Sequence, residues 1–177
     1  MKEKTMSFRT ANLIALLFSF ILAPIIIAPY NFFIKDGSDT GSFAPHPIWF
    51  AIILISVIIV HELIHGICFA LFTKGGFKSV HFGIKWKALA PYCHCSEAIN
   101  VQQLRIAILM PTIILGFIPT IIAYIVNDFT IMLLGCCLIL GGIGDFIALW
   151  MLRNFDKNTI VMDHPDKIGF FYEEINE

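Results

Sequence analysis

Four long apolar stretches constrain the fold of this chain more than any other feature. A helix needs about 20 apolar residues to cross a hydrocarbon core of roughly 30 Å. Stretches of this length cover residues 11–30, 48–72, 106–126 and 130–152. Only 14% of the 177 residues are charged, and the mean hydropathy of +0.81 is unusual for a soluble domain. We therefore predict an all-α integral membrane protein, a four-transmembrane-helix bundle forming a single domain over residues 1–177.

The positions of the basic residues predict how this bundle is oriented. Of the twelve lysines and arginines, only Lys35 lies between the first and second stretches. Because short cytoplasmic segments are enriched in Lys and Arg, we expect a multi-pass protein of the cell membrane with both termini and the loop 73–105 in the cytoplasm. The lipid bilayer is the expected partner, and a bundle this small is also compatible with a homodimer. The net charge of −1 gives no reason to expect nucleic acid.

The loop between the second and third stretches contains a strand-like pattern. Apolar residues alternate with polar residues and glycine over Val80, His81, Phe82, Gly83, Ile84, Lys85, Trp86 and Lys87. Period-two alternation is typical of a half-buried strand. We expect a small cytoplasmic β-hairpin between helices two and three. Its edge could pair with an extended substrate peptide; the alternative is a hairpin that only packs on the bundle.

The chemistry of the chain is concentrated in polar residues inside apolar stretches. Within the four stretches the acidic residues are Glu62 and Asp145, and the histidines are His61 and His65. Such residues are costly in a membrane unless they face a partner or a cavity. His61 and His65 lie one helical turn apart, so both imidazoles can bind one metal ion, with Glu62 beside them as a general base. The segment His-Glu-Leu-Ile-His therefore predicts a metal-dependent hydrolase.

Asp145 is the expected third metal ligand, because a catalytic zinc usually takes three protein ligands and leaves one position open. At 1.5 Å per residue, Asp145 lies about 12 Å from Arg153 along its helix, and His65 lies about 14 Å from Lys74. The aspartate and the histidines thus have comparable depths. Glycines next to the candidate ligands predict a close approach of helices two and four; they are Gly66, Gly141, Gly142 and Gly144.

Two alternatives to Asp145 remain open in the loop segment Cys93-His94-Cys95. His94 could reach over the site as a ligand or stabilise an oxyanion, and a thiolate of Cys93 or Cys95 could bind zinc. His164, in the tail, has no predicted role beyond a turn or helix start.

Several of these motifs together resemble a known family. They are HELIHG in the second stretch, the segment around Tyr92–Cys95, Gly-Gly-x-Gly-Asp with Trp150 in the fourth, and the tail Asp163-His164-Pro165. Over most of the chain they resemble the small bacterial membrane proteins grouped as putative zincin peptidases. That family is distantly similar to the site-2 intramembrane metalloproteases, whose third zinc ligand is an aspartate two helices after HExxH. In the site-2 pattern a glycine follows the aspartate, whereas Gly144 precedes Asp145 here.

The resemblance implies a zinc metalloendopeptidase that hydrolyses peptide bonds of membrane-protein or peptide substrates. It places Zn²⁺ on His61, His65 and Asp145 and makes Glu62 the catalytic residue. The competing hypothesis is a non-catalytic zinc-binding membrane regulator or accessory protein, which would bind zinc without cleaving any substrate. Ion transport is disfavoured, because the stretches carry no second set of polar residues towards the outer face.

Overall fold

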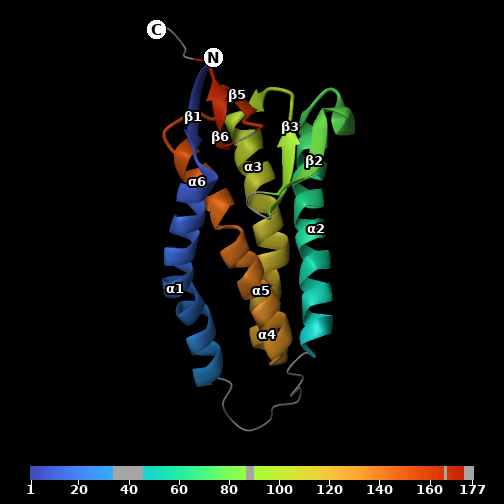
Figure 1. The fold of residues 1–177 in the computed structure, drawn as a ribbon, viewed down its shortest axis with the longest axis vertical. Helices are drawn as coiled ribbons and strands as arrows, with labels where there is room; N and C mark the ends of the chain where they lie inside the picture. The colour runs from blue at the N-terminus through green and yellow to red at the C-terminus, as the bar shows by residue number, and fades with distance from the viewer. Residues whose placement is uncertain (34–45, 87–89, 166, 174–177) are drawn as a thin grey trace.

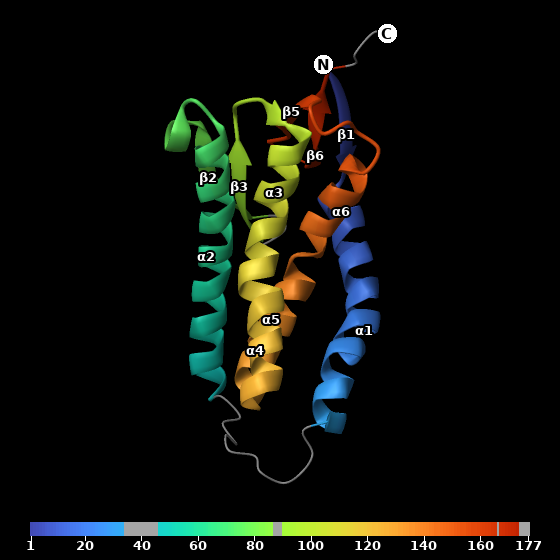
Figure 2. The ribbon, with the colours of Figure 1, turned by 180° about the vertical axis from the view of Figure 1, so that it is seen from behind.

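A bundle of upright helices carries all its β-strands at one end (Figures 1 and 2). The computed structural model describes residues 1–33, 46–86, 90–165 and 167–173. The predicted outer loop with Lys35, and Lys87 of the predicted hairpin, lie outside the described residues.

All four predicted stretches are helical. The helices are α1 (Phe8–Phe33), α2 (Pro47–Phe72), α3 (Val101–Thr112), a π-helical segment η2 (Ile113–Phe117), α4 (Ile118–Val126), α5 (Phe129–Gly141) and α6 (Ile143–Leu152). Three helical stretches in the described parts of the chain are long and apolar enough to cross a membrane: Phe8–Tyr30, Pro47–Phe72 and Val101–Val126. The α5–α6 pair is bent by 43° and counts as a fourth if both helices form one span. The fourth stretch is therefore a broken helix.

The strands form two antiparallel sheets. They are β1 (Lys2–Met6), β2 (Val80–Lys85), β3 (Ala90–Cys95), β4 (Ile99–Asn100), β5 (Ile160–Asp163) and β6 (Ile168–Tyr172). Strands β2 and β3 pair as the hairpin that the alternating pattern predicts. The other four strands form a sheet in the order β1-β6-β5-β4. The predicted all-α class is therefore wrong, although the chain is mainly helical. These strands are short, and β1 pairs with β6 from the opposite end of the chain, so the sheet depends on long-range pairing rather than on local pattern.

The four-stranded sheet packs against the ends of three helices, α2, α3 and α6. One apolar core joins the ends of α2, α3 and α6 to the strands, and it includes Phe69, Leu104, Leu152, Val161 and Phe170. The Arg105 guanidinium of α3 donates to the Leu152 carbonyl at the end of α6 at 2.7 Å, in addition to the turn hydrogen bond that this carbonyl accepts from the Phe155 amide. The strands and α3 thus pack against the ends of α2 and α6.

The turns between helices follow local sequence rules. Asn100 and Gln103 form a capping box at the start of α3. Asn127 ends α4 in the left-handed conformation with φ 56°, and the Asp128 carboxylate accepts a hydrogen bond from the Ile131 amide at the start of α5. Asn127 and Asp128 thus form a tight turn between α4 and α5.

The break between α5 and α6 lies at Gly142, beside α3. A Cβ atom on Gly142 would lie 2.5 Å from Thr112 Oγ1 and 3.3 Å from the Leu138 carbonyl oxygen. A Cβ atom on Gly66 of α2 would collide with the Phe82 ring of β2. The prediction that these glycines bring the second and fourth apolar stretches together is therefore wrong. Gly142 allows α6 to approach α3, and Gly66 allows the hairpin to approach α2.

Replacing Gly142 by alanine should destabilise the protein, because the new methyl group overlaps Thr112. Overpacking of this kind costs roughly 1–3 kcal/mol. Gly141→Ala is the matched control, since nothing among the described residues lies within 4 Å of its added Cβ. Thermal unfolding of detergent-purified variants should show a lower midpoint for Gly142→Ala alone; equal midpoints would contradict this account of the helix break.

Candidate metal centre

Two buried histidines project from one face of α2. His61 and His65 are each 7% exposed, and their ring centroids lie 4.9 Å apart. An unbroken α-helix places residues i and i+4 on the same side, so α2 alone sets the spacing of these two side chains.

Asp145 reaches the two histidines from the first turn of α6. Its Oδ2 atom lies 3.2 Å from His61 Nε2 and 3.6 Å from His65 Nε2. One candidate ligand atom from each of the three residues lies within 4.8 Å of the others. No other group of three or more His, Cys, Asp or Glu residues with metal-binding spacing occurs in the described segments. The structure thus brings together the three residues that the depth argument selects.

The hydrogen bonding of His65 fits a cation at this point. His65 Nδ1 lies 2.8 Å from the Ala107 carbonyl oxygen of α3, and a carbonyl can only accept, so Nδ1 carries the proton. In the neutral ring, Nε2 then presents a lone pair towards the Asp145 carboxylate, which is also an acceptor. Ligand atoms about 2.0–2.1 Å from a tetrahedral zinc are about 3.3 Å apart, close to the separations from Asp145. The donor set and its spacing therefore fit zinc.

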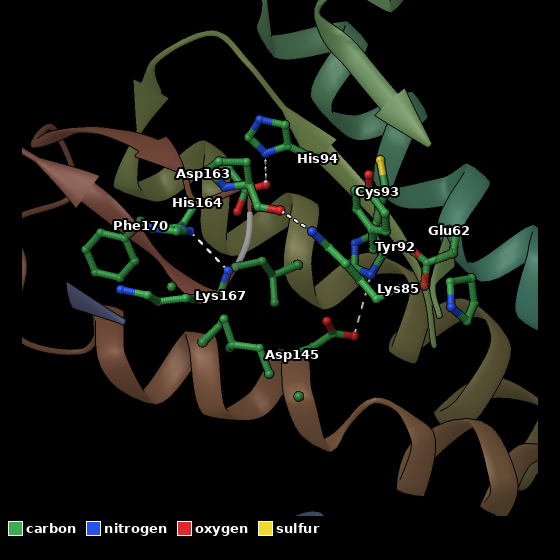
Figure 3. A pocket seen from close by; sticks show the side chains of 18 of the residues that line it. Glu62, Lys85, Tyr92, Cys93, His94, Asp145, Asp163, His164, Lys167 and Phe170 are labelled. Atoms are coloured by element: carbon green, nitrogen blue, oxygen red, sulfur yellow. Dashed lines mark hydrogen bonds and ion pairs between the residues drawn. The ribbon is translucent and has the colours of Figure 1, made fainter. Parts of the chain in front are cut away.

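Glu62 lines the same cavity as the three candidate ligands. The cavity has a volume of about 230 Å³, and Figure 3 shows Glu62 on α2 and Asp145 on α6 both facing it. The backbone of Cys93 in β3 is a hydrogen-bonding partner of the Glu62 carboxylate. The expected general base thus lies beside the candidate metal ligands, with its carboxylate held by a neighbouring strand.

His94 does not join the candidate ligands. Its Nδ1 atom donates to the Asp163 carboxylate at 2.9 Å, and Figure 3 shows the His94 ring on the far side of Asp163 from Asp145. The geometry favours Asp145 over His94 as a partner of the two histidines.

The two loop cysteines are also poor candidates for zinc ligands. Burial raises the pKa of the Cys93 thiol, and the carboxylates of Glu62 and Asp163 raise it further. Burial likewise raises the pKa of the Cys95 thiol, whose sulfur lies 3.5 Å from the Glu97 carbonyl oxygen. Neither thiol belongs to the group of closely spaced ligand atoms that His61, His65 and Asp145 form.

The C-terminal tail contributes cavity residues that the sequence does not predict. The turn between β5 and β6 brings Asp163, His164 and Lys167 to the cavity. His164 Nε2 lies 3.3 Å from the Glu3 carboxylate, while Lys85 reaches from β2 to donate to the Pro165 carbonyl at 2.7 Å (Figure 3). The segment Asp163-His164-Pro165 is recognisable in the sequence, but nothing local shows that it folds back to the cavity.

Comparison with protein families adds one match. A family model described as "Putative zincin peptidase" matches residues 53–160. This range is more than half of the chain and contains His61, Glu62, His65 and Asp145. No curated protein and no solved structure matches the chain.

Loss of any one of the three candidate ligands should abolish stoichiometric metal binding. We expect about one zinc per chain in the wild type and far less in His61→Ala, His65→Ala and Asp145→Ala, as measured by elemental analysis of detergent-purified protein. His94→Ala is the control and should retain zinc. Retention by Asp145→Ala would reject Asp145 as the third ligand. A zinc-free wild type would leave the three residues as a buried polar cluster.

Proposed function

Because this chain belongs to the putative zincin peptidase family, we propose that it is a zinc-dependent metalloendopeptidase of the His-Glu-x-x-His type. One observation carries the proposal: His61, His65 and Asp145 offer three ligand atoms within 4.8 Å of one another, and Glu62 lines the same cavity. Three protein ligands with an open fourth position are characteristic of catalytic rather than structural zinc sites.

His61, His65 and Asp145 would bind the metal. Glu62 would accept a proton from the attacking water and donate it to the leaving group. A zinc ion bound there would supply a Lewis acid and lower the pKa of a water molecule. Glu62 accepts the proton of the attacking water as general base. It then donates this proton to the nitrogen of the leaving amine, so the carboxylate ends the cycle in its starting form. The hydrogen bond from β3 keeps this carboxylate in the cavity between the two transfers.

The substrates we propose are segments of membrane proteins. Glu62 and both histidines lie within Pro47–Phe72, a helix apolar enough to cross a membrane. Large apolar side chains on the outer helices are highly exposed, including Phe20 at 73% and Leu71 at 76%, and a lipid bilayer would cover such side chains. A peptide bond must be accessible from its backbone to be hydrolysed, so the substrate would lie extended in the cavity, beside β3.

Both termini are proposed to lie in the cytoplasm. β1 pairs with β6 along its whole length, from Lys2 with Tyr172 to Met6 with Ile168, so the N-terminal strand and the C-terminal strand lie at the same end of the bundle. The bias of basic residues towards this end supports its assignment to the cytoplasm.

Glu62→Gln tests the catalytic proposal directly. The amide keeps the shape of the side chain but cannot accept the proton, so zinc content should be unchanged while cleavage falls by about 10²–10⁴-fold. Cleavage of model membrane substrates in proteoliposomes would be followed by mass spectrometry, with the wild type as the active reference. Undiminished zinc-dependent cleavage by Glu62→Gln would remove Glu62 from this role. Bound zinc without cleavage by the wild type would support the regulatory alternative.

The orientation is tested with reporter fusions at the C-terminus, expressed in bacteria. A green fluorescent protein fusion should be fluorescent and an alkaline phosphatase fusion inactive, because the first reporter folds in the cytoplasm and the second outside it. The reverse pattern would place the strand-bearing end on the outer side.

A further inference from the structure

A buried proline lies in α3 opposite the metal centre. Pro111 is four residues after Ala107 and lies inside the helix. In an α-helix the N–H group of residue i donates to the carbonyl of residue i−4. Proline has no N–H group, and its ring crowds that carbonyl. The Ala107 carbonyl therefore lacks the helical donor that any other residue at position 111 would supply.

The Ala107 carbonyl has a different donor, and that donor is a candidate metal ligand. His65 Nδ1 of α2 lies 2.8 Å from the Ala107 oxygen. Ala107 is 0% exposed, and Pro111 is among the most deeply buried side chains. A buried carbonyl needs a hydrogen-bond donor, and at this position the neighbouring helix provides it.

We propose that Pro111 is a positioning residue for the metal centre. Because proline has no backbone N–H group to donate to the Ala107 carbonyl, this carbonyl stays free to accept the hydrogen bond from His65 Nδ1. The imidazole is thereby held in the tautomer with the proton on Nδ1, and its Nε2 lone pair faces Asp145. This inference rests on the proposed function, because it takes His65 as a zinc ligand.

The expected loss of zinc affinity follows from weakening the hydrogen bond between His65 Nδ1 and the Ala107 carbonyl. Partners of the second ring nitrogen fix the orientation and tautomer of a zinc-binding histidine, and losing them typically weakens metal binding by about 10–100-fold. A residue with an N–H group at position 111 would compete for the Ala107 oxygen and draw it back along the axis of α3. A carbonyl can accept two hydrogen bonds, so competition should weaken the His65 contact rather than abolish it.

Pro111→Ala restores the missing donor, and Pro119→Ala is its matched control. Pro119 lies in the same helical stretch, about 12 Å further along, and no residue of the metal cluster uses the carbonyl that its substitution would occupy. Zinc affinity would be measured on purified full-length protein by competition with a chelator. Pro111→Ala should bind zinc about tenfold more weakly, whereas Pro119→Ala should remain close to wild type.

The tautomer of His65 gives a second readout that general loosening of the structure would not change. Nitrogen-15 NMR of metal-free, histidine-labelled protein, at a pH alkaline enough to leave the His65 ring neutral, would report the protonated ring nitrogen, with the His65 signal assigned by its loss in His65→Gln. The wild type should show the Nδ1–H form, and Pro111→Ala should gain the Nε2–H form. A wild-type His65 protonated on Nε2 would overturn the inference even if Pro111→Ala failed to fold.

The outcomes separate this inference from the proposed function. If the wild type binds zinc while Pro111→Ala keeps the same affinity and the same tautomer, the role of Pro111 is rejected and the metallopeptidase proposal stands. If carefully prepared wild type binds no zinc, the proposed function is rejected and the inference with it.

Discussion

The partly buried contact of Asp145 with His61 and His65 is the constraint on which the rest of the structure depends. Polar and ionisable groups among apolar helices are costly unless they are paired or bind a cation. The contact therefore requires α2 and α6 to be held at a fixed separation, although glycines do not bring these two helices together directly. That separation is set by the elements around them: α3, the four-stranded sheet and the hairpin.

Helix α3 contacts both helices that supply the candidate ligands, α2 and α6. Its Ala107 carbonyl orients His65 on α2, while Arg105 holds the end of α6 through the Leu152 carbonyl. On the same helix, Thr112 lies against Gly142, where the fourth apolar stretch bends and α6 begins. The residues that position the candidate ligands are thus spread along one helix that supplies no ligand itself. A local change in the backbone of α3 would therefore shift the candidate metal ligands on α2 and α6.

Much of this arrangement follows from short-range rules, and the remainder depends on tertiary contacts. Apolar length predicts the helical stretches, and helical periodicity predicts that His61 and His65 share a face. Comparable depth also identifies Asp145, because helices packed side by side bring residues of equal depth close together. The sheet could not be predicted in this way, since β1 and β6 pair across almost the whole chain. The partners of Gly66 and Gly142 depend on how the hairpin and α3 pack, which the glycine pattern does not encode. The same limit applies to Asp163 and His164, which reach the cavity only because the tail folds back.

The tail and hairpin also explain how hydrolysis could proceed at a site surrounded by apolar helices. A hydrolase needs water at the scissile bond, whereas a lipid-covered bundle excludes it. Asp163 and Lys167 from the tail, with Lys85 from the hairpin, line the same cavity as Glu62 and the metal cluster, so charged side chains from the strand-bearing end reach the site beside apolar ones. The catalytic proposal therefore depends on strands as much as on helices: the helices provide the ligands and the base, and the strands provide a polar route by which water and an extended peptide can reach them.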